Sequence, residues 1–151
     1  MSLMRGKNLV ALNNVIVLAL KNADHYEEEA ARLDGELAGY FKALANRRRE
    51  AAEDLGAILR RSGDMPKEPD RDLESFEEAL SRLKALVASN EEVALLRERV
   101  QSERELAETV KKALAFRVPE ESRPILQELE AEIGKTLMKL RQLIDSESTG
   151  S

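Results

Sequence analysis

Apolar residues recur along most of the chain at alternating steps of three and four, the spacing that lines one face of an α-helix. No segment alternates apolar and polar residues in the manner of a strand. The pattern therefore predicts an all-α protein, with five helices over about residues 5–33, 34–61, 70–88, 89–114 and 119–143. The stripe of the first helix consists of Leu9, Leu12, Ile16, Ala19, Ala23, Tyr26, Ala30 and Leu33.

Polar and helix-breaking residues mark the ends of these segments. Asp34 fits the N-cap of the second helix, and Ser89 with Glu92 fits a capping box at the start of the fourth. Residues 65–69 include two prolines and form the one clear linker. Residues 116–119 predict a turn, because proline is favoured at the beginning of the helix that follows.

The lengths of the connections predict how the helices are arranged. Short turns after the first and fourth helices favour two antiparallel hairpins, and the helix over 70–88 must then join them. We therefore expect a ferritin-like antiparallel four-helix bundle with an additional crossover helix, and an up-down bundle of five helices is the open alternative. The expected single domain covers 5–145, with disordered tails at 1–4 and 146–151.

Composition narrows the range of functions. Of the 151 residues, 35% are charged and only 3% are aromatic, as is usual for helix-forming sequences. The net charge of −5 disfavours nucleic acid as a partner. The absence of cysteine excludes disulfides and thiolate metal sites and suits a cytoplasmic protein. The longest apolar run, 15–20, is far shorter than the ~20 residues of a membrane helix, so we expect no membrane association.

Two charged residues occupy positions where the stripes require an apolar residue, Arg48 in the second helix and Glu103 in the fourth. An unpaired buried charge is costly, so we expect the two to pair near the middle of the bundle, with Tyr26 as a further partner. The alternatives are that their side chains extend to the surface, or that they belong to a functional site. Small residues at this level would leave room for long polar side chains: Ala19, Ala23, Ala51, Ala107 and Gly134.

Candidate metal ligands are few. His25 is the only histidine, and we expect it to be solvated. Di-metal carboxylate bundles use a Glu-x-x-His motif on two helices, which this chain lacks. We therefore predict no metal and no cofactor, with Glu27, Glu28, Glu103 and His25 as the weak candidates. No phosphate-binding loop or nucleophile motif is present, so no catalytic residue is predicted.

One further pattern extends from about residue 9 to 143 and consists of residues 12–14, 27–31, Phe41, 44–45, Arg48, 54–55, Glu103, 113–114 and 118–119. In this pattern the chain resembles an uncharacterised bacterial family assigned a ferritin-like domain of unknown function. The resemblance implies a ferritin-like bundle and supports the crossover topology. Relatives often have an acid where this chain has Arg104 and a histidine where it has Leu137, so the resemblance does not carry a metal site with it.

The leading functional prediction is a non-catalytic bundle that acts through self-association or protein binding. The first half of the first helix is apolar around most of its circumference, which predicts a homodimer unless the helix over 70–88 covers this surface. Two rival functions are a degenerate carboxylate metal-binding bundle and an export or secretion chaperone that binds a partner helix. The residues expected to mediate self-association are Val10, Val17, Leu18 and Leu20.

Overall fold

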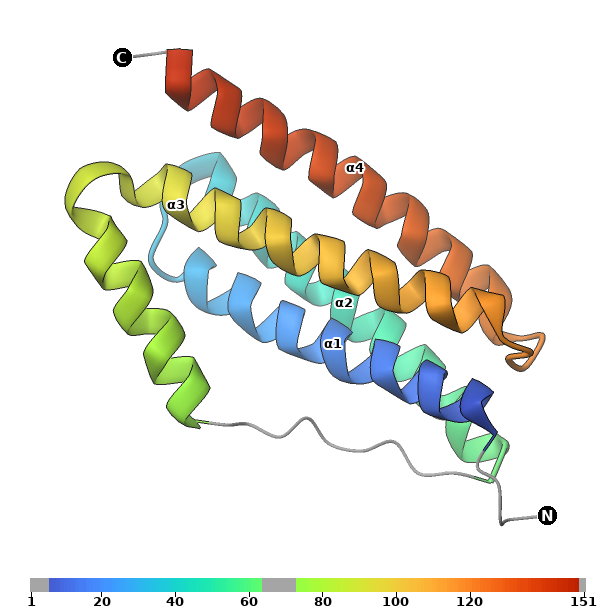
Figure 1. Cartoon of the computed structure of the whole chain (residues 1–151). Helices are drawn as coiled ribbons and strands as arrows, with labels where there is room; N and C mark the ends of the chain where they lie inside the picture. The colour runs from blue at the N-terminus through green and yellow to red at the C-terminus, as the bar shows by residue number, and fades with distance from the viewer. Residues whose placement is uncertain (1–5, 64–72, 150–151) are drawn as a thin grey trace.

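The computed structural model describes residues 6–63 and 73–149, and the side chains of residues 6, 8–63 and 92–146. This part of the chain forms helices and no strands, which confirms the all-α prediction. Figure 1 shows the helices packed side by side as a bundle. The helices are α1 (Lys7–Ala30), α2 (Gly35–Arg61), α3 (Leu73–Ala115) and α4 (Ser122–Thr149).

Contacts at both ends of the bundle show that α1 and α3 run in opposite directions. At the start of α1, Asn8 Nδ2 donates a hydrogen bond of 2.7 Å to the backbone oxygen of Arg117, just after α3. At the other end of α1, Glu29 lies beside Arg99, well inside α3. The N-terminal end of α1 therefore lies next to the C-terminal end of α3 (Figure 1).

Helices α2 and α4 are antiparallel as well. Arg61, the last residue of α2, forms an ion pair of 2.8 Å with Glu121, just before α4, and Arg47 lies 3.3 Å from Glu132 further along. Since α1 and α2 form a hairpin, α2 and the packed part of α3 point the same way (Figure 1). The described helices therefore do not simply alternate up and down along the chain.

The prediction of separate helices over 70–88 and 89–114 is wrong, because α3 is one helix from Leu73 to Ala115. Residues 73–115 contain no glycine or proline, and the helix does not end at the expected capping box of Ser89 and Glu92. Figure 1 shows instead that α3 bends sharply, so its green part lies at a steep angle to its yellow and orange part.

The helix ends differ from the predicted ones in two further places. Helix α4 begins at Ser122 rather than near 119, which places Pro124 in its first turn, where a missing N–H costs little. It also continues to Thr149, through part of the predicted tail, because no helix-breaking residue occurs before Gly150. The predicted tail at 1–4 and the linker at 65–69 lie outside the described residues.

The buried apolar residues form two clusters rather than one continuous core. In every helix the two clusters separate at the same level of the bundle. The first cluster extends to Ala19 in α1, Ala52 in α2, Leu106 in α3 and Ile133 in α4. The second cluster begins at Ala23, Ala45, Val100 and Leu140 of the same four helices. Between these limits lies a layer of buried polar side chains, which is the candidate site.

Candidate functional site

The layer between the two apolar clusters receives one buried polar side chain from each helix. All four are at most 4% exposed, so none can rely on bulk water for its hydrogen bonds. Because each lies on the inward face of its helix, the layer runs through the full cross-section of the bundle. The four residues are Asn22 of α1, Arg48 of α2, Glu103 of α3 and Thr136 of α4.

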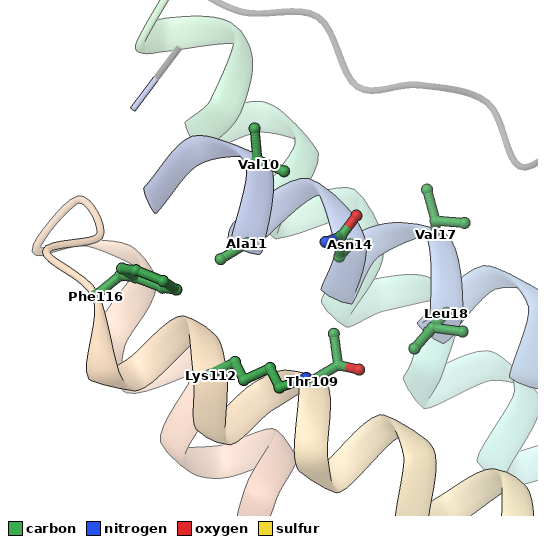
Figure 2. A pocket seen from close by; sticks show the side chains of 8 residues that line it. All are labelled: Val10, Ala11, Asn14, Val17, Leu18, Thr109, Lys112 and Phe116. Carbon is green, nitrogen blue, oxygen red and sulfur yellow. The ribbon is translucent and has the colours of Figure 1, made fainter. Parts of the chain in front are cut away.

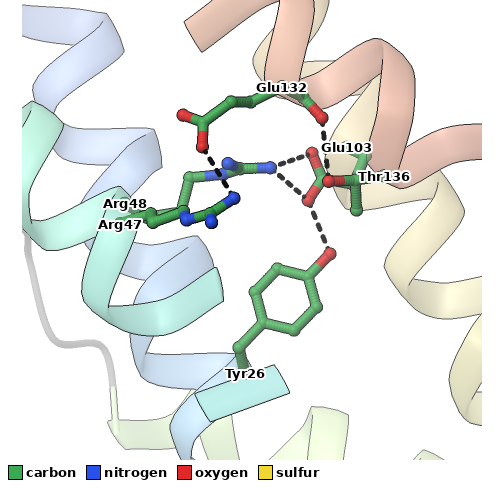
Figure 3. Close-up of polar contacts among 6 residues, drawn as sticks. All are labelled: Tyr26, Arg47, Arg48, Glu103, Glu132 and Thr136. Atoms are coloured by element: carbon green, nitrogen blue, oxygen red, sulfur yellow. Dashed lines mark hydrogen bonds and ion pairs between the residues drawn. The ribbon is translucent and has the colours of Figure 1, made fainter. Parts of the chain in front are cut away.

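The structure brings Arg48 and Glu103, the two charges that interrupt the stripes, into direct contact (Figure 3). Arg48 Nη2 donates hydrogen bonds of 2.8 and 2.9 Å to the two carboxylate oxygens of Glu103. The Tyr26 hydroxyl donates a third hydrogen bond, of 2.5 Å, to Glu103 Oε1. Both side chains of the ion pair are completely buried, so the charge of Glu103 is neutralised inside the core by residues from α1 and α2.

Tyr26 is held in place from several sides. Its ring packs edge-on against Phe41, with ring centroids 4.9 Å apart, and the Arg99 guanidinium lies 5.7 Å from its centroid. Burial first, and then the charge of Glu103 and the hydrogen bond to it, raise the pKa of Tyr26 well above its usual value. The hydroxyl therefore stays protonated and acts as a donor.

The remaining polar atoms of the layer are less well satisfied. Arg48 Nε and Nη1 and Asn22 Oδ1 are buried without a hydrogen-bond partner. The Thr136 hydroxyl donates to the backbone oxygen of Glu132 in its own helix, at 2.9 Å, and does not bind Glu103 (Figure 3). The α4 helix thus contributes a polar wall to the layer without entering the Arg48–Glu103–Tyr26 network.

Arg99 and Glu29 form a second buried ion pair, which the sequence pattern did not reveal. Arg99 Nε lies 3.1 Å from Glu29 Oε1, although the contact does not have hydrogen-bond geometry. The pKa of Glu29 is raised to about 7, mainly by burial. The positive charge of Arg99 lowers this pKa, and the negative charges of Glu98 and Glu28 raise it. One signal was available: Glu29 lies three residues after Tyr26, and Arg99 four before Glu103, so both lie on the inward faces of their helices.

The weak metal candidates do not come together. Glu27 pairs with Arg49, while Glu28 lies 3.6 Å from Arg32. The described residues include no group of three or more histidine, aspartate or glutamate side chains placed to hold a metal ion. His25, which we expected to be solvated, is partly buried, and burial followed by the charge of Arg99 lowers its pKa to about 4.

The room for the polar layer comes from fewer small residues than predicted. Ala19 and Ala23 are completely buried at its level, as expected. Ala51 and Ala107 are only partly buried, and Gly134 is exposed on the outer face of α4. A side chain at Gly134 would meet no neighbouring atom within 4 Å, so this glycine is not needed for the layer.

A second feature lies on the surface beside the first half of α1. Of the predicted self-association residues, Val10 is 46% exposed, whereas Val17, Leu18 and Leu20 are partly buried. Three of these residues, Val10, Val17 and Leu18, border an open groove of about 540 Å³ between α1 and the end of α3, together with Phe116, which is 39% exposed (Figure 2). Leu20 lies outside it. The groove is lined by Val10, Ala11, Asn14, Val17, Leu18, Thr109, Lys112 and Phe116.

Hydrogen bonds hold the Phe116 end of this groove in place. Besides the bond from Asn8 to the Arg117 backbone, Arg123 Nη2 donates to the backbone oxygens of Leu114 and Phe116, at 3.3 and 3.2 Å. These bonds satisfy carbonyl groups that the end of α3 leaves open. The segment after α3 is therefore held against the start of α1 and of α4 by hydrogen bonds within the chain.

The fold and these two sites define an all-helical bundle with a polar layer in its core and an apolar groove on its surface. Comparison with protein-family models finds no family that matches the chain, and comparison with curated proteins finds no similar sequence. Within the described part of the chain, every helix is too short or too polar to span a membrane.

The buried network makes the effect of Glu103→Ala predictable. The change leaves Arg48 as an unpaired cation in the core, so unfolding should become easier by about 3–5 kcal/mol. Replacing both charges by Arg48→Met and Glu103→Leu should cost much less, when combined with Tyr26→Phe to remove the hydroxyl that would lack an acceptor. Urea unfolding measures each change, and equal losses in the single and the combined variants would show that the pair is not the cause.

Glu29 should make stability depend on pH. Its pKa is about 7 in the folded state against an ordinary 4.5, so between these values only the folded protein holds the proton. The free energy of unfolding therefore falls as pH rises through this window. Glu29→Gln mimics the protonated form at every pH, so its stability relative to the wild type should rise by about 2 to 3 kcal/mol between pH 5 and 8.

Urea unfolding of both proteins at several pH values tests this expectation. Taking the difference between the two proteins removes the opposite contribution of His25, whose lowered pKa makes stability rise with pH. A difference that stays constant from pH 5 to 8 would contradict the assignment to Glu29.

Proposed function

We propose that this protein is a non-catalytic, ferritin-like bundle that acts by binding another polypeptide in the groove between α1 and α3. The observation that carries the proposal is the groove itself, in which Val10 and Phe116 expose apolar surface between two helices. Contiguous exposed apolar surface on a water-soluble domain usually marks a site of association. A groove between two helices accepts the apolar face of a third.

The directions of the helices support the ferritin-like assignment. Two neighbouring hairpins joined by a connection that spans the bundle is the arrangement with one long crossover. In this interpretation, the first part of α3 supplies the predicted crossover helix. The cytoplasmic location expected from the cysteine-free composition belongs to the same proposal.

The contacts of Glu103 support a binding role over a catalytic or metal-dependent one. Ferritin-like carboxylate proteins hold metal ions with inward-facing glutamates. Here the inward-facing carboxylate accepts three hydrogen bonds from Arg48 and Tyr26, and a metal ion would have to displace both. The groove does not lead into the polar layer, because no residue of that layer lines the groove.

Photo-crosslinking in the cells that produce the protein tests association at this surface. A photoreactive amino acid at Val10, at the edge of the groove, should form an adduct with a polypeptide, whereas the same residue at Lys139 on α4 should not. An adduct of twice the chain mass would identify the homodimer predicted from the sequence, and any other mass would identify a different partner. Adducts from both positions, or from neither, would contradict the proposal.

A further inference from the structure

The two segments that form the groove differ in charge from the rest of the chain. The whole protein has 29 acidic and 24 basic residues, but residues 7–23 and 109–119 contain no aspartate or glutamate at all. Lys112 lines the groove, and two further basic residues are exposed nearby, Lys111 near the end of α3 and Arg117 just after it. The basic residues of the two segments are Lys7, Lys21, Lys111, Lys112 and Arg117.

This charge pattern disfavours a second copy as the occupant of the groove. A twofold interface places the same surface on both sides, so it would bring basic groups toward basic groups. Like charges brought together across an interface are costly, whereas complementary charges steer association and select the partner. The nearest acidic residues along α3, Glu105 and Glu108, precede Thr109 and do not line the groove.

The shape of the groove favours a helix as its occupant. Val10, Asn14 and Val17 follow one another along α1 at steps of four and three, so they form a line about two turns, or roughly 10 Å, long. A partner helix can place apolar side chains at the matching positions i, i+3 or i+4, and i+7. An extended membrane surface fits a groove between two helices less well than it fits a convex apolar face.

We propose that the groove binds an amphipathic helix of another protein, one that carries aspartate or glutamate beside its apolar stripe. The apolar stripe would lie against Val10, Val17 and Phe116, and the acidic residues would face Lys112 and the neighbouring basic groups. This proposal rests on the proposed association at the same groove and adds the chemistry of the partner.

Two synthetic helical peptides of 18 residues test this chemistry. Both carry the same leucine stripe, and one has glutamates beside it where the other has lysines. Fluorescence anisotropy with labelled peptides should show that the acidic peptide binds at least about tenfold more tightly, although the net charge of −5 alone would favour the basic one. This preference should shrink between low salt and 0.5 M salt, because added ions screen exposed charges.

Matched variants locate the effect. Lys112→Glu should weaken the acidic peptide about three- to tenfold, since it replaces an attraction by a repulsion at an exposed site. Lys139→Glu, the same change on exposed α4 surface outside the groove, should leave binding unchanged. Val17→Glu should weaken both peptides, and circular dichroism confirms that each variant is folded.

Every other result would overturn the proposed partner. Equal binding of both peptides would show an apolar groove without charge selection, and the proposed function would stand. Dimers in sedimentation equilibrium with no peptide binding would make a second copy the occupant. Binding to phosphatidylglycerol vesicles with no peptide binding would make it a membrane. Failure of all three, together with no crosslink from Val10, would refute the proposed function as well.

Discussion

The bundle depends on the neutralisation of one buried carboxylate. Glu103 carries its charge where the side chain has no access to water, and an isolated charge in such a place would destabilise the fold. Arg48 supplies the opposite charge from α2, and Tyr26 supplies a hydrogen bond from α1. Since these bonds form only when the three helices stand at the right height, the network fixes their alignment in a way that interchangeable leucine and alanine contacts do not.

The second ion pair extends this polar contact along the bundle. Glu29 lies against Arg99, whose guanidinium lies over the Tyr26 ring, and the Tyr26 hydroxyl reaches Glu103. These contacts form a line of polar groups that links α1, α3 and α2. The line lies beside the apolar cluster around Tyr26 and Phe41, which is the cluster nearer the turn between α1 and α2. The other cluster, around Leu55 and Leu129, contains no such group and lies beneath the groove. One half of the bundle therefore fixes the register of the helices, and the other lies beneath the groove.

The sequence predicts the class of fold and the Arg48–Glu103 contact because both follow from periodicity: a charge that interrupts a regular apolar stripe must find a partner. It does not predict Glu29 and Arg99, because each lies next to an apolar residue, Ala30 or Val100, that the stripe assigns to the core. The buried face of each helix is wider than its apolar stripe, so a residue beside the stripe can also be buried. The continuity of α3 is missed because capping-box residues are tolerated inside a helix. Phe116, assigned to a turn, becomes part of the groove only through the packing of α3 on α1.

The central claim is that Arg48 and Tyr26 satisfy Glu103 in place of a metal ion, and elemental analysis of the untagged protein tests it most directly. Inductively coupled plasma mass spectrometry of protein purified without chelators should find no transition metal in a stoichiometric amount. The reason is that the Glu103 oxygens accept hydrogen bonds from Arg48 and Tyr26. About one or two iron, manganese or zinc ions per chain, the content of a carboxylate-bundle metal centre, would contradict this account.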